Sequence, residues 1–561
     1  MSAESATSPG GEVGEVASAL LARRLVVALA GSGVRQVVYC PGSRDAPLGY
    51  ALHSAEQAGL VRVHVRLDER AAAFMALGIA KATAVSGQPT PVVVVATSGT
   101  AVANLHPALC EADSAGLPVI ACTADRPHEM WGTGANQTTR QLGLFGPIMR
   151  RVEDVPADFP PDERLDGLVS RAVRAGTGEL GSDPGPVQIN VCFREPLAPR
   201  LPWRPDGGGP RLPWRPDGGG PQQAWPTGTP HIPASAGAHR IEMPAQIEMP
   251  PRTVVVAGDA AGPLAQQVAL DGGWPLLAEP SSGARFGPNA LTDYQRCVRG
   301  PLSEELEGVL VYGHPTLSRP VSALLADRGP RIVAVVDRAR WTDVSGLAQV
   351  FRGPLVVSGA APSGWLDAWQ SESRPDRYRE PSLKEAACAS IWTAHCAQDA
   401  PSLVIGASEP IRAFDRWAVP GRDAPMVIAN RGLAGIDGTV ATATGVWAGL
   451  GRPVRVVIGD LTAIHDAMGM LRGEAELEPD VQVVVLADGG GAIFAGLEHA
   501  GAEPELFRRF FRTPQLFDLA GLARSIGADY RRVVVGEELE AALREPIHGR
   551  SYLEVPLTPR G

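Results

Sequence analysis

Short runs of apolar residues that end in glycine or a polar side chain recur along the whole chain. The clearest are residues 91–96 (PVVVVA), residues 118–123 and the two runs that begin at Val454 and Val481. Apolar runs of about four to eight residues between turn signals are typical of strands buried on both faces of a parallel sheet. Segments with helical spacing alternate with these runs, for example residues 16–30 and 383–396. The pattern therefore predicts an α/β protein built on parallel sheets.

Length and composition divide this pattern into several domains. At 561 residues the chain is too long for one ordinary core, and three domains are expected. Residues 197–252 are rich in Pro and Gly and contain a tandem repeat, RLPWRPDGGGP, at 200–210 and 211–221. Such a composition cannot bury a core and predicts a linker. The predicted division is an α/β domain at 1–196, a linker at 197–252, a central α/β domain at 253–379 and a last α/β domain at 380–561.

Charge and cysteine content narrow the class of partner. The net charge of −10 and a pI near 5.7 argue against a protein that binds nucleic acid or an anionic membrane. No apolar run has the length of a membrane span, and the first residues carry no basic start or apolar signal core, so a cytoplasmic location is expected. The seven cysteines form no CxxC pair, which favours buried free thiols over disulfides or a zinc site.

Residues 454–494 carry the clearest candidate chemistry. Two apolar runs end in Gly459-Asp460 and in Asp488 followed by three glycines, with a helical segment between them. Ligands bind beyond the carboxyl ends of strands in open α/β sheets, so Asp460 and Asp488 are expected side by side in a crevice. Two carboxylates beside exposed backbone carbonyls suit a hard divalent cation that holds a phosphate. An equally weighted alternative makes Asp460 a helix cap and the glycines loop residues.

The strand ends of the first third also carry polar groups. Residues 36–40 run into Pro-Gly-Ser43-Arg44, and residues 61–67 run into Asp68-Glu69-Arg70 at the start of a helix. An arginine at the rim of a sheet can hold a carboxylate by two hydrogen bonds. The plainer alternatives are a turn with a solvated arginine and a helix N-terminal acid that contributes a few tenths of a kcal/mol, on the order of 0.3.

Two further strand ends lie in the last third, where residues 402–405 and 426–429 precede GASEPIR and NRGLAGIDG. The central domain has strands that end in VVAGD and VVD, which resemble strand ends of nucleotide-binding folds. Neither is followed by GxGxxG, so a bound NAD or FAD is discounted.

Five motifs, in order along the chain, decide between these alternatives: PGSRDAPL, LDERAAAF, ATSGTAVANLHPALCEA, TADRPHE and GTGANQTTRQLGLFG. Together with the Gly-Asp and Asp-Gly-Gly-Gly pair they resemble the 2-succinyl-5-enolpyruvyl-6-hydroxy-3-cyclohexene-1-carboxylate synthase family of thiamin diphosphate enzymes. The resemblance implies three parallel-sheet domains in the arrangement of these enzymes: pyrimidine-binding, central and diphosphate-binding. It also implies a carboligase of menaquinone biosynthesis that decarboxylates 2-oxoglutarate and adds the resulting succinyl-semialdehyde carbanion to isochorismate.

The resemblance assigns roles to individual residues. Glu69 would hydrogen-bond the aminopyrimidine ring and act as the catalytic residue. Magnesium, with manganese as the alternative, would be bound by Asp460, Asp488 and the carbonyl of Gly490, although the family more often has Asn at the position of Asp488. The cofactor contacts fall on Glu69, Ser98, Gly99, Ile436, Gly459, Asp460, Leu461, Thr462, Ile493 and Phe494. The substrate contacts fall on Ser43, Arg44, Arg126, Asn136, Gln137, Arg285, Ser408, Arg412 and Arg431.

The family pairs the first domain of one subunit with the last domain of another, so the resemblance implies a homodimer or a homotetramer. Two rival functions stay open. Another thiamin diphosphate lyase or 2-oxoacid decarboxylase would need fewer arginines, since its substrates are small monoanions. A catalytically silent relative that only binds ligand would have no need of Glu69.

Overall fold

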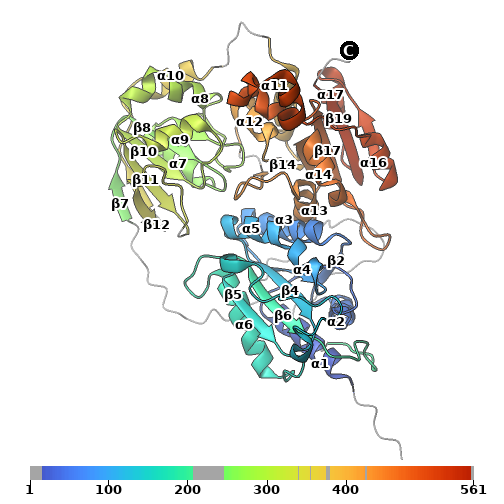
Figure 1. The fold of residues 1–561 in the computed structure, drawn as a ribbon. Coiled ribbons are helices and arrows are strands. Elements are labelled where there is room, and N and C mark those ends of the chain that lie inside the picture. The colour runs from blue at the N-terminus through green and yellow to red at the C-terminus, as the bar shows by residue number, and fades with distance from the viewer. Residues whose placement is uncertain are drawn as a thin grey trace, which may run out of the picture.

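The computed structural model describes residues 15–205, 245–338, 340–353, 355–374, 380–423 and 426–557. The tandem repeat therefore lies outside the described residues from position 206 onward. Figure 1 shows three α/β bodies: the first domain in blue and cyan, the central domain in green and yellow, and the last domain in orange and red.

The first domain is a parallel sheet covered by helices on both faces. Its strand order is β2-β1-β3-β4-β6-β5. In β3 alternate valines enter two different cores: Val93 and Val95 pack with α1, α2 and α6, whereas Val92 and Val94 pack with α3 and α5. This two-sided burial explains why the strand is an unbroken apolar run. Its strands are β1 (Gln36–Tyr39), β2 (Arg62–Val65), β3 (Val92–Ala96), β4 (Val119–Asp125), β5 (Arg151–Val155) and β6 (Val187–Cys192). Its α-helices are α1 (Ala17–Gly31), α2 (Ala46–Gln57), α3 (Glu69–Val85), α4 (Thr100–Asn104), α5 (His106–Ala115) and α6 (Glu163–Thr177).

The central domain has a parallel sheet in the order β12-β11-β10-β8-β9 and a separate two-stranded parallel pair, β13-β7. Strand β7 lies inside the range predicted as linker, and its pairing with β13 attaches that end of the range to the central domain. The strands are β7 (Ala245–Glu248), β8 (Thr253–Ala257), β9 (Leu276–Ala278), β10 (Gly308–Tyr312), β11 (Arg331–Val336), β12 (Gln349–Arg352) and β13 (Leu355–Ser358). The helices are α7 (Leu264–Gly272), α8 (Tyr294–Arg299), α9 (Arg319–Ala326) and α10 (Trp365–Glu372).

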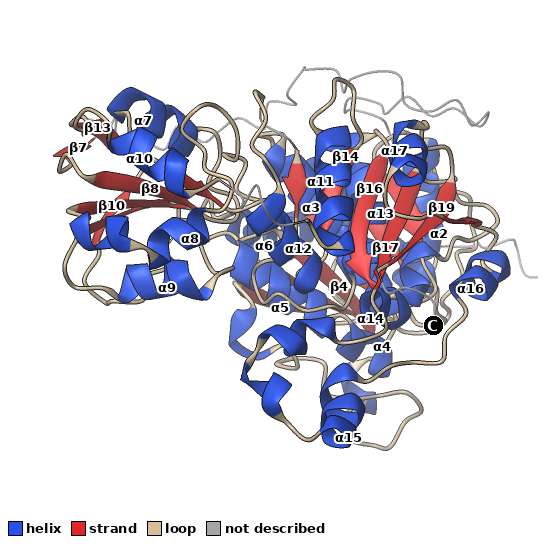
Figure 2. Ribbon diagram, turned by 90° about the horizontal axis from the view of Figure 1, so that it is seen from above, coloured by secondary structure: helices blue, strands red, loops and turns tan. Residues whose placement is uncertain are grey.

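The last domain repeats the architecture of the first, with strand order β15-β14-β16-β17-β19-β18. Its helices also lie on both faces of the sheet (Figure 2). The strands are β14 (Ser402–Ile405), β15 (Val427–Ile428), β16 (Val454–Gly459), β17 (Val481–Ala487), β18 (Asp529–Arg532) and β19 (Arg550–Pro556). The helices are α11 (Leu383–His395), α12 (Glu409–Trp417), α13 (Thr439–Leu450), α14 (Asp460–His465), α15 (Pro504–Leu506), α16 (Leu519–Ser525) and α17 (Glu537–Arg544).

The expected crossover helix between β16 and β17 is short, because α14 ends at His465. The next residue, Asp466, is buried and its carboxylate accepts the backbone N–H groups of Val440 and Ala441 at the start of α13. The chain after α14 therefore serves as a cap for a neighbouring helix, and a 3-10 turn at Ala467–Met470 follows.

Helices α3 and α13 join the first and last domains at close range (Figure 1). A Cβ added at Gly78 would lie 2.1 Å from the carbonyl oxygen of Thr442, and one at Gly445 would lie 2.1 Å from that of Met75. The small residues of both helices therefore allow their backbones to touch. Because Glu69 begins α3, this contact also fixes where the candidate catalytic acid lies.

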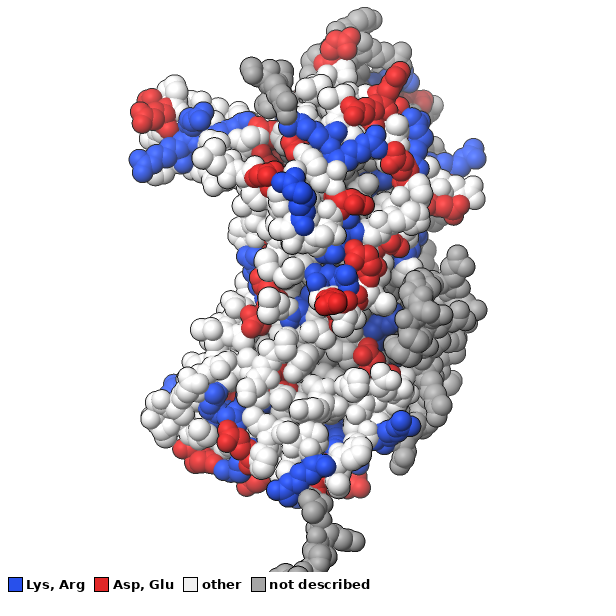
Figure 3. Space-filling view, turned by 90° about the vertical axis from the view of Figure 1, so that its right-hand side faces the viewer, with Lys and Arg blue, Asp and Glu red and all other residues white. Residues whose placement is uncertain are grey.

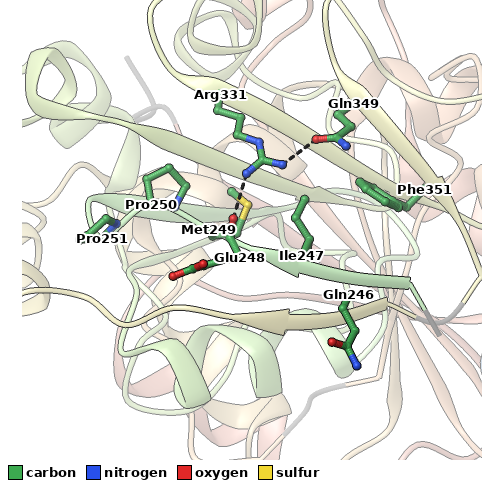
Figure 4. Close-up of a pocket in the computed structure, with 9 residues that line it drawn as sticks. All are labelled: Gln246, Ile247, Glu248, Met249, Pro250, Pro251, Arg331, Gln349 and Phe351. Carbon is green, nitrogen blue, oxygen red and sulfur yellow. Dashed lines mark hydrogen bonds between the residues drawn. The ribbon is translucent and has the colours of Figure 1, made fainter.

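A groove lies away from the predicted site residues. It has a volume of about 510 Å³ and lies in the central domain between β7 and the strands β11 and β12, where Arg331 donates to the carbonyl of Glu248 and to Gln349 (Figure 4). No predicted site residue lines this groove. Basic and acidic side chains are interspersed on the face shown in Figure 3. Among the described residues, no helix combines the length and apolar character that a membrane crossing requires.

Candidate functional site

A cavity of about 180 Å³ lies beyond the carboxyl ends of β14, β16 and β17 in the last domain. This is the edge at which open α/β sheets bind ligands. Ten of the residues predicted for the cofactor, metal or substrate line it: Ser408, Ile436, Gly459, Asp460, Leu461, Thr462, Asp488, Gly490, Ile493 and Phe494.

Asp460 is held in place by backbone donors at the ends of two neighbouring strands. Its Oδ2 accepts the N–H groups of Gly489 at 2.8 Å and Gly490 at 2.9 Å, and its Oδ1 accepts the N–H of Leu461 at 2.7 Å. Burial and the charge of Asp488 raise the pKa of Asp460. The carboxylate therefore ties the glycine turn after β17 to the end of β16.

Asp488 lies next to Asp460 in the cavity lining. Burial raises the pKa of Asp488 and outweighs the opposite effect of the Lys384 ammonium. The Lys384 Nζ is 3.1 Å from Oδ2 of Asp488. Two residues further on, Gly490 has φ +123°, and a Cβ there would lie 2.2 Å from the carbonyl oxygen of Arg512. Glycine is required at this position by both the backbone angle and the contact.

This donor set fits a hard divalent cation. Burial disfavours the ionised form of both carboxylates, and at Asp460 the charge of Asp488 adds to this effect. A cation between the two carboxylates would stabilise their ionised forms. Carboxylates and backbone carbonyls are the oxygen ligands that magnesium and manganese prefer.

Two arginines converge above the end of β14. Arg412 donates to the carbonyl of Ser408 at 2.9 Å, and Arg431 donates to that of Ala407 at 3.4 Å and to the Thr316 hydroxyl at 3.2 Å. Burial and the charge of Arg431 lower the pKa of Arg412. A carboxylate placed here would relieve the repulsion between the two guanidinium groups.

The loop that carries Arg431 is anchored by the first domain. Glu111 of α5 accepts the N–H groups of Gly432 at 2.9 Å and Leu433 at 2.7 Å. Lys81 of α3 lies 3.5 Å from Glu111 and donates to the carbonyl of Ala429 at 3.0 Å. Both side chains are buried, so this pair positions the segment between β15 and α13.

A second polar cluster lies at the carboxyl edge of the first sheet. Arg126, after β4, donates to the Ser98 hydroxyl at 2.5 Å and to the carbonyl of Gln137 at 2.7 Å. Gln137 in turn donates to the carbonyl of Ser98 at 2.8 Å, and a Cβ on Gly99 would lie 2.8 Å from its side chain. Burial and the charge of Arg44 lower the pKa of Arg126, so the two arginines act on one region.

The other predicted first-domain residues surround this cluster. Arg44 donates to the carbonyl of Phe193 at 2.9 Å, whereas Ser43 and Asn136 are exposed. Glu69 is partly exposed and accepts from Asn104 of α4 at 3.3 Å. None of the described residues that line the cavity at Asp460 comes from the first domain, so Glu69 is not part of its lining.

Arg285 has a different environment from the other predicted substrate contacts. Its side chain is fully buried and donates to the carbonyls of Ala278, Thr292, Asp415 and Ala418. These bonds join the central domain to α12, so in this structure the guanidinium is used within the protein.

The structure also adds residues that the sequence did not indicate. Lys384 and Glu409 line the cavity, and Lys81 and Glu111 support the Arg431 loop. Glu409 lies in GASEPIR, beside the predicted Ser408 and Arg412, but nothing in the spacing of Lys384 or Glu111 marked them.

Comparison with known proteins identifies two domains of the chain. Residues 20–144 match the family described as thiamine pyrophosphate enzyme, N-terminal TPP binding domain, and residues 416–555 match the corresponding C-terminal TPP binding domain. Thiamine pyrophosphate is thiamin diphosphate. The chain is thus a member of the thiamin diphosphate enzymes, with both cofactor-binding domains present.

Individual relatives give a finer assignment. The chain is 42% identical to 2-succinyl-5-enolpyruvyl-6-hydroxy-3-cyclohexene-1-carboxylate synthase of Paenarthrobacter aurescens, over 96% of this chain and 94% of the relative. It is 42% identical to the protein of that name from Renibacterium salmoninarum, over 95% and 93%, and 38% identical to that from Mycobacterium marinum, over 95% of each. The chain belongs to the 2-succinyl-5-enolpyruvyl-6-hydroxy-3-cyclohexene-1-carboxylate synthase family.

Proposed function

We propose that the protein catalyses the reaction for which its relatives are named. It decarboxylates 2-oxoglutarate with thiamin diphosphate and adds the remaining four-carbon unit to isochorismate. The products are 2-succinyl-5-enolpyruvyl-6-hydroxy-3-cyclohexene-1-carboxylate and carbon dioxide, a step of menaquinone biosynthesis. The observation that carries the proposal is the match to synthases of this name, at 42% identity over 96% of the chain.

The last domain would hold the diphosphate end of the cofactor. Asp460, Asp488 and the carbonyl of Gly490 are proposed to bind magnesium, with manganese as the alternative, and the cation neutralises the diphosphate. Bound thiamin diphosphate supplies the nucleophilic carbon and the electron sink that decarboxylation of a 2-oxoacid requires. Ile436 offers an apolar surface to the ring system, with Ile493 and Phe494 as further apolar cover.

The first domain would supply the proton chemistry. Glu69 is proposed to hydrogen-bond the aminopyrimidine ring and to transfer a proton at that ring, with Ser98 and Gly99 leaving space for the ring beside it. General acid–base catalysis of this kind contributes about 10² to 10⁴ in rate. Because the cavity at Asp460 has no lining from the first domain of its own chain, we propose that Glu69 acts on the cofactor held by a second subunit. A homodimer is then the smallest active species, and a homotetramer would contain two such pairs.

Four arginines are proposed to bind the carboxylates of the two substrates. Both 2-oxoglutarate and isochorismate carry two carboxylates, and Arg44, Arg126, Arg412 and Arg431 supply four cations at the two strand edges. Ser43, Asn136, Gln137 and Ser408 add neutral donors. Fixed cations in a site shielded from water also stabilise the negative charge that develops during decarboxylation and addition. A lyase for small monoanionic 2-oxoacids would gain little from so many.

The test is turnover by the purified full chain with thiamin diphosphate, magnesium, 2-oxoglutarate and isochorismate. We expect isochorismate to disappear in step with carbon dioxide release. Pyruvate in place of 2-oxoglutarate should give little turnover, because it lacks the second carboxylate. Turnover with pyruvate alone would instead assign the protein to the small-2-oxoacid lyases, and binding of cofactor without any turnover would assign it to the silent relatives.

A further inference from the structure

Lys384 lies in the cavity that holds the two candidate metal ligands. It is the second residue of α11, and its Nζ is 3.1 Å from Asp488 and 3.8 Å from Glu409. Among the residues that the structure describes, it is the only lysine or arginine in the cavity lining. The choice of residue is also unusual for this chain, which contains 51 basic residues of which two, Lys81 and Lys384, are lysines.

The position of Lys384 is not one that helix stability favours. The first turn of a helix has a partial positive charge and is stabilised by acidic side chains, so a lysine there costs about 0.3 to 1 kcal/mol. The same turn already has a complete capping box formed by Ser382 and Glu385. Lys384 therefore does not stabilise the start of the helix. We look for its function in the cavity that it lines.

The charges in the cavity require a cation in addition to the metal. Asp460 and Asp488 together cancel the charge of one divalent cation and leave the loaded site neutral. Glu409 is already paired with Arg416 at 3.1 Å. Among the charges that line the cavity, Lys384 then gives the metal-loaded site a single positive charge, and Arg512, which donates to the carbonyl of Asp488, lies outside that lining. An amide at position 488 without a lysine would leave the same single positive charge.

We propose that Lys384 is the charge partner that makes Asp488 compatible with a diphosphate site. Its ammonium competes with the metal for the Asp488 carboxylate and attracts the diphosphate once the metal is in place. Lys384 thus weakens metal binding and strengthens diphosphate binding. Lysine suits this role because its ammonium is a compact point charge that can turn from a carboxylate to a phosphate oxygen. The inference rests on the proposed function, in which this cavity holds the metal and diphosphate.

The inference predicts opposite changes in two binding constants. In Lys384→Met, which keeps the length of the side chain and removes its charge, we expect magnesium to bind about tenfold more tightly without cofactor. Thiamin diphosphate should bind about tenfold more weakly at saturating magnesium. Isothermal titration calorimetry on the full chain measures both. A purely structural role of Lys384 would weaken both or change neither, and either result would overturn the inference.

Two further variants separate charge from structural damage. The double variant Lys384→Met/Asp488→Asn restores the single positive charge, so its affinity for thiamin diphosphate should return to about the wild-type value. Arg524→Met removes an exposed cation of the same domain, paired with Asp518 at 3.6 Å, and should change neither constant. A double variant as weak as Lys384→Met would contradict the charge argument.

Chemical labelling tests the contact without reference to affinity or activity. With two lysines in the chain, an amine-reactive acetylating reagent followed by peptide mass spectrometry reports on Lys384 alone in its peptide. We expect acetylation of Lys384 in the free protein and protection by magnesium with thiamin diphosphate. Equal labelling in both states would overturn the inference. If the wild-type protein bound neither magnesium nor thiamin diphosphate, the proposed function would fail with it, whereas binding of both with unprotected Lys384 would leave the proposed function intact.

Discussion

The first and last domains share a fold and differ in what their strand ends carry. Their sheets have the same strand order, so β1, β2, β3 and β4 correspond to β14, β15, β16 and β17. In both domains the predicted site residues follow these four strands. Arginines follow two of the four strands in each domain: Arg44 and Arg126 follow β1 and β4 in the first, and Arg412 and Arg431 follow β14 and β15 in the last.

The difference lies at the ends of the middle strands. After β3 the first domain has Ser98-Gly99, a hydroxyl followed by a residue without a side chain, whereas after β16 the last domain has Gly459-Asp460. The acid of the first domain, Glu69, lies instead after β2, at the start of α3. One topology therefore places a hydroxyl and a glycine after the middle strand in one domain and a carboxylate, Asp460, after the corresponding strand in the other. The fold determines where chemistry can lie, and a few residues determine which chemistry it is.

The largest expected effects come from substituting one candidate acid in each of the two domains, Glu69 in the first and Asp460 in the last. Glu69→Gln should lose about 10² to 10⁴ in kcat while still binding thiamin diphosphate, because the amide keeps the shape of the side chain and cannot transfer a proton. Asp460→Asn should lose cofactor binding itself. Steady-state kinetics and calorimetry measure the two defects.

Mixing these two inactive variants sharpens the comparison. If the halves come from different subunits, a mixed dimer contains one site with both acids intact, and a random equal mixture should recover activity at about a quarter of its sites. Asp460→Asn mixed with itself serves as the control. No recovery after demonstrated subunit exchange would mean that each chain completes its own site.

The arginine pairs should separate substrate binding from cofactor binding. Arg431→Gln removes a cation beside Arg412 and should raise KM for a dicarboxylate substrate about 10- to 100-fold, since charge-assisted hydrogen bonds contribute roughly 1.5–3 kcal/mol. Thiamin diphosphate affinity should stay near the wild-type value. Arg319→Met, an exposed arginine paired with Glu498, is the control expected to change neither. A variant that lost cofactor affinity instead would place Arg431 in the diphosphate site.

Local sequence pattern was sufficient for several inner strands. The strand expected at residues 402–405 is β14 with the same bounds, because it is an apolar run buried along its whole length. Strands β5 and β18 were not predicted, since RVEDV and DYRR are edge strands with polar, partly exposed residues. An edge strand is partly exposed and does not need an unbroken apolar pattern. Whether a segment forms an edge strand depends on the assembled sheet and cannot be read from the segment alone.

The same distinction between local pattern and tertiary packing applies to the site residues. Asp460 and Asp488 could be paired from the sequence because each follows its own strand directly, and the structure places both on one cavity. Lys384, Glu111 and Lys81 lie on helices and reach their partners only through tertiary packing. Arg285 shows the converse, because a motif in a loop gave no sign that the side chain would be fully buried.

The contact between the two domains can be weakened at its glycines. Gly445→Ala places a Cβ 2.1 Å from the backbone oxygen of Met75, so the helices α3 and α13 must separate. We expect a loss of about 1–3 kcal/mol in the free energy of unfolding, as for other overpacked contacts. Urea denaturation measures it. Gly31→Ala at the end of α1, where nothing lies within 4 Å of the added Cβ, is the matched control and should be nearly neutral.

A buried acid in the first domain gives the smallest effect, a dependence of stability on pH. Burial raises the pKa of Asp45, which follows Ser43 and Arg44, to about 7, compared with about 4 in an unfolded chain. Between these values the folded state keeps a proton that the unfolded state has lost, so the free energy of unfolding falls as pH rises, by about 1 kcal/mol per pH unit. Above pH 7 both states are ionised and this dependence ends.

Asp45→Asn cannot lose this proton, so the difference in stability between wild type and variant should grow from pH 5 to pH 7 in favour of the variant and then stay constant. Urea denaturation of both proteins across that range tests it. Asp466→Ala is the comparison from the last domain: Asp466 also has a pKa raised to about 7 by burial, but it accepts two N–H groups of α13. That variant should lose stability at every pH, because the two N–H groups at the helix start would lose their acceptor. A parallel response of both variants would mean that the two buried acids are equivalent. A divergent response would show that Asp466 is a structural cap and that Asp45 is a buried charge that destabilises the folded state.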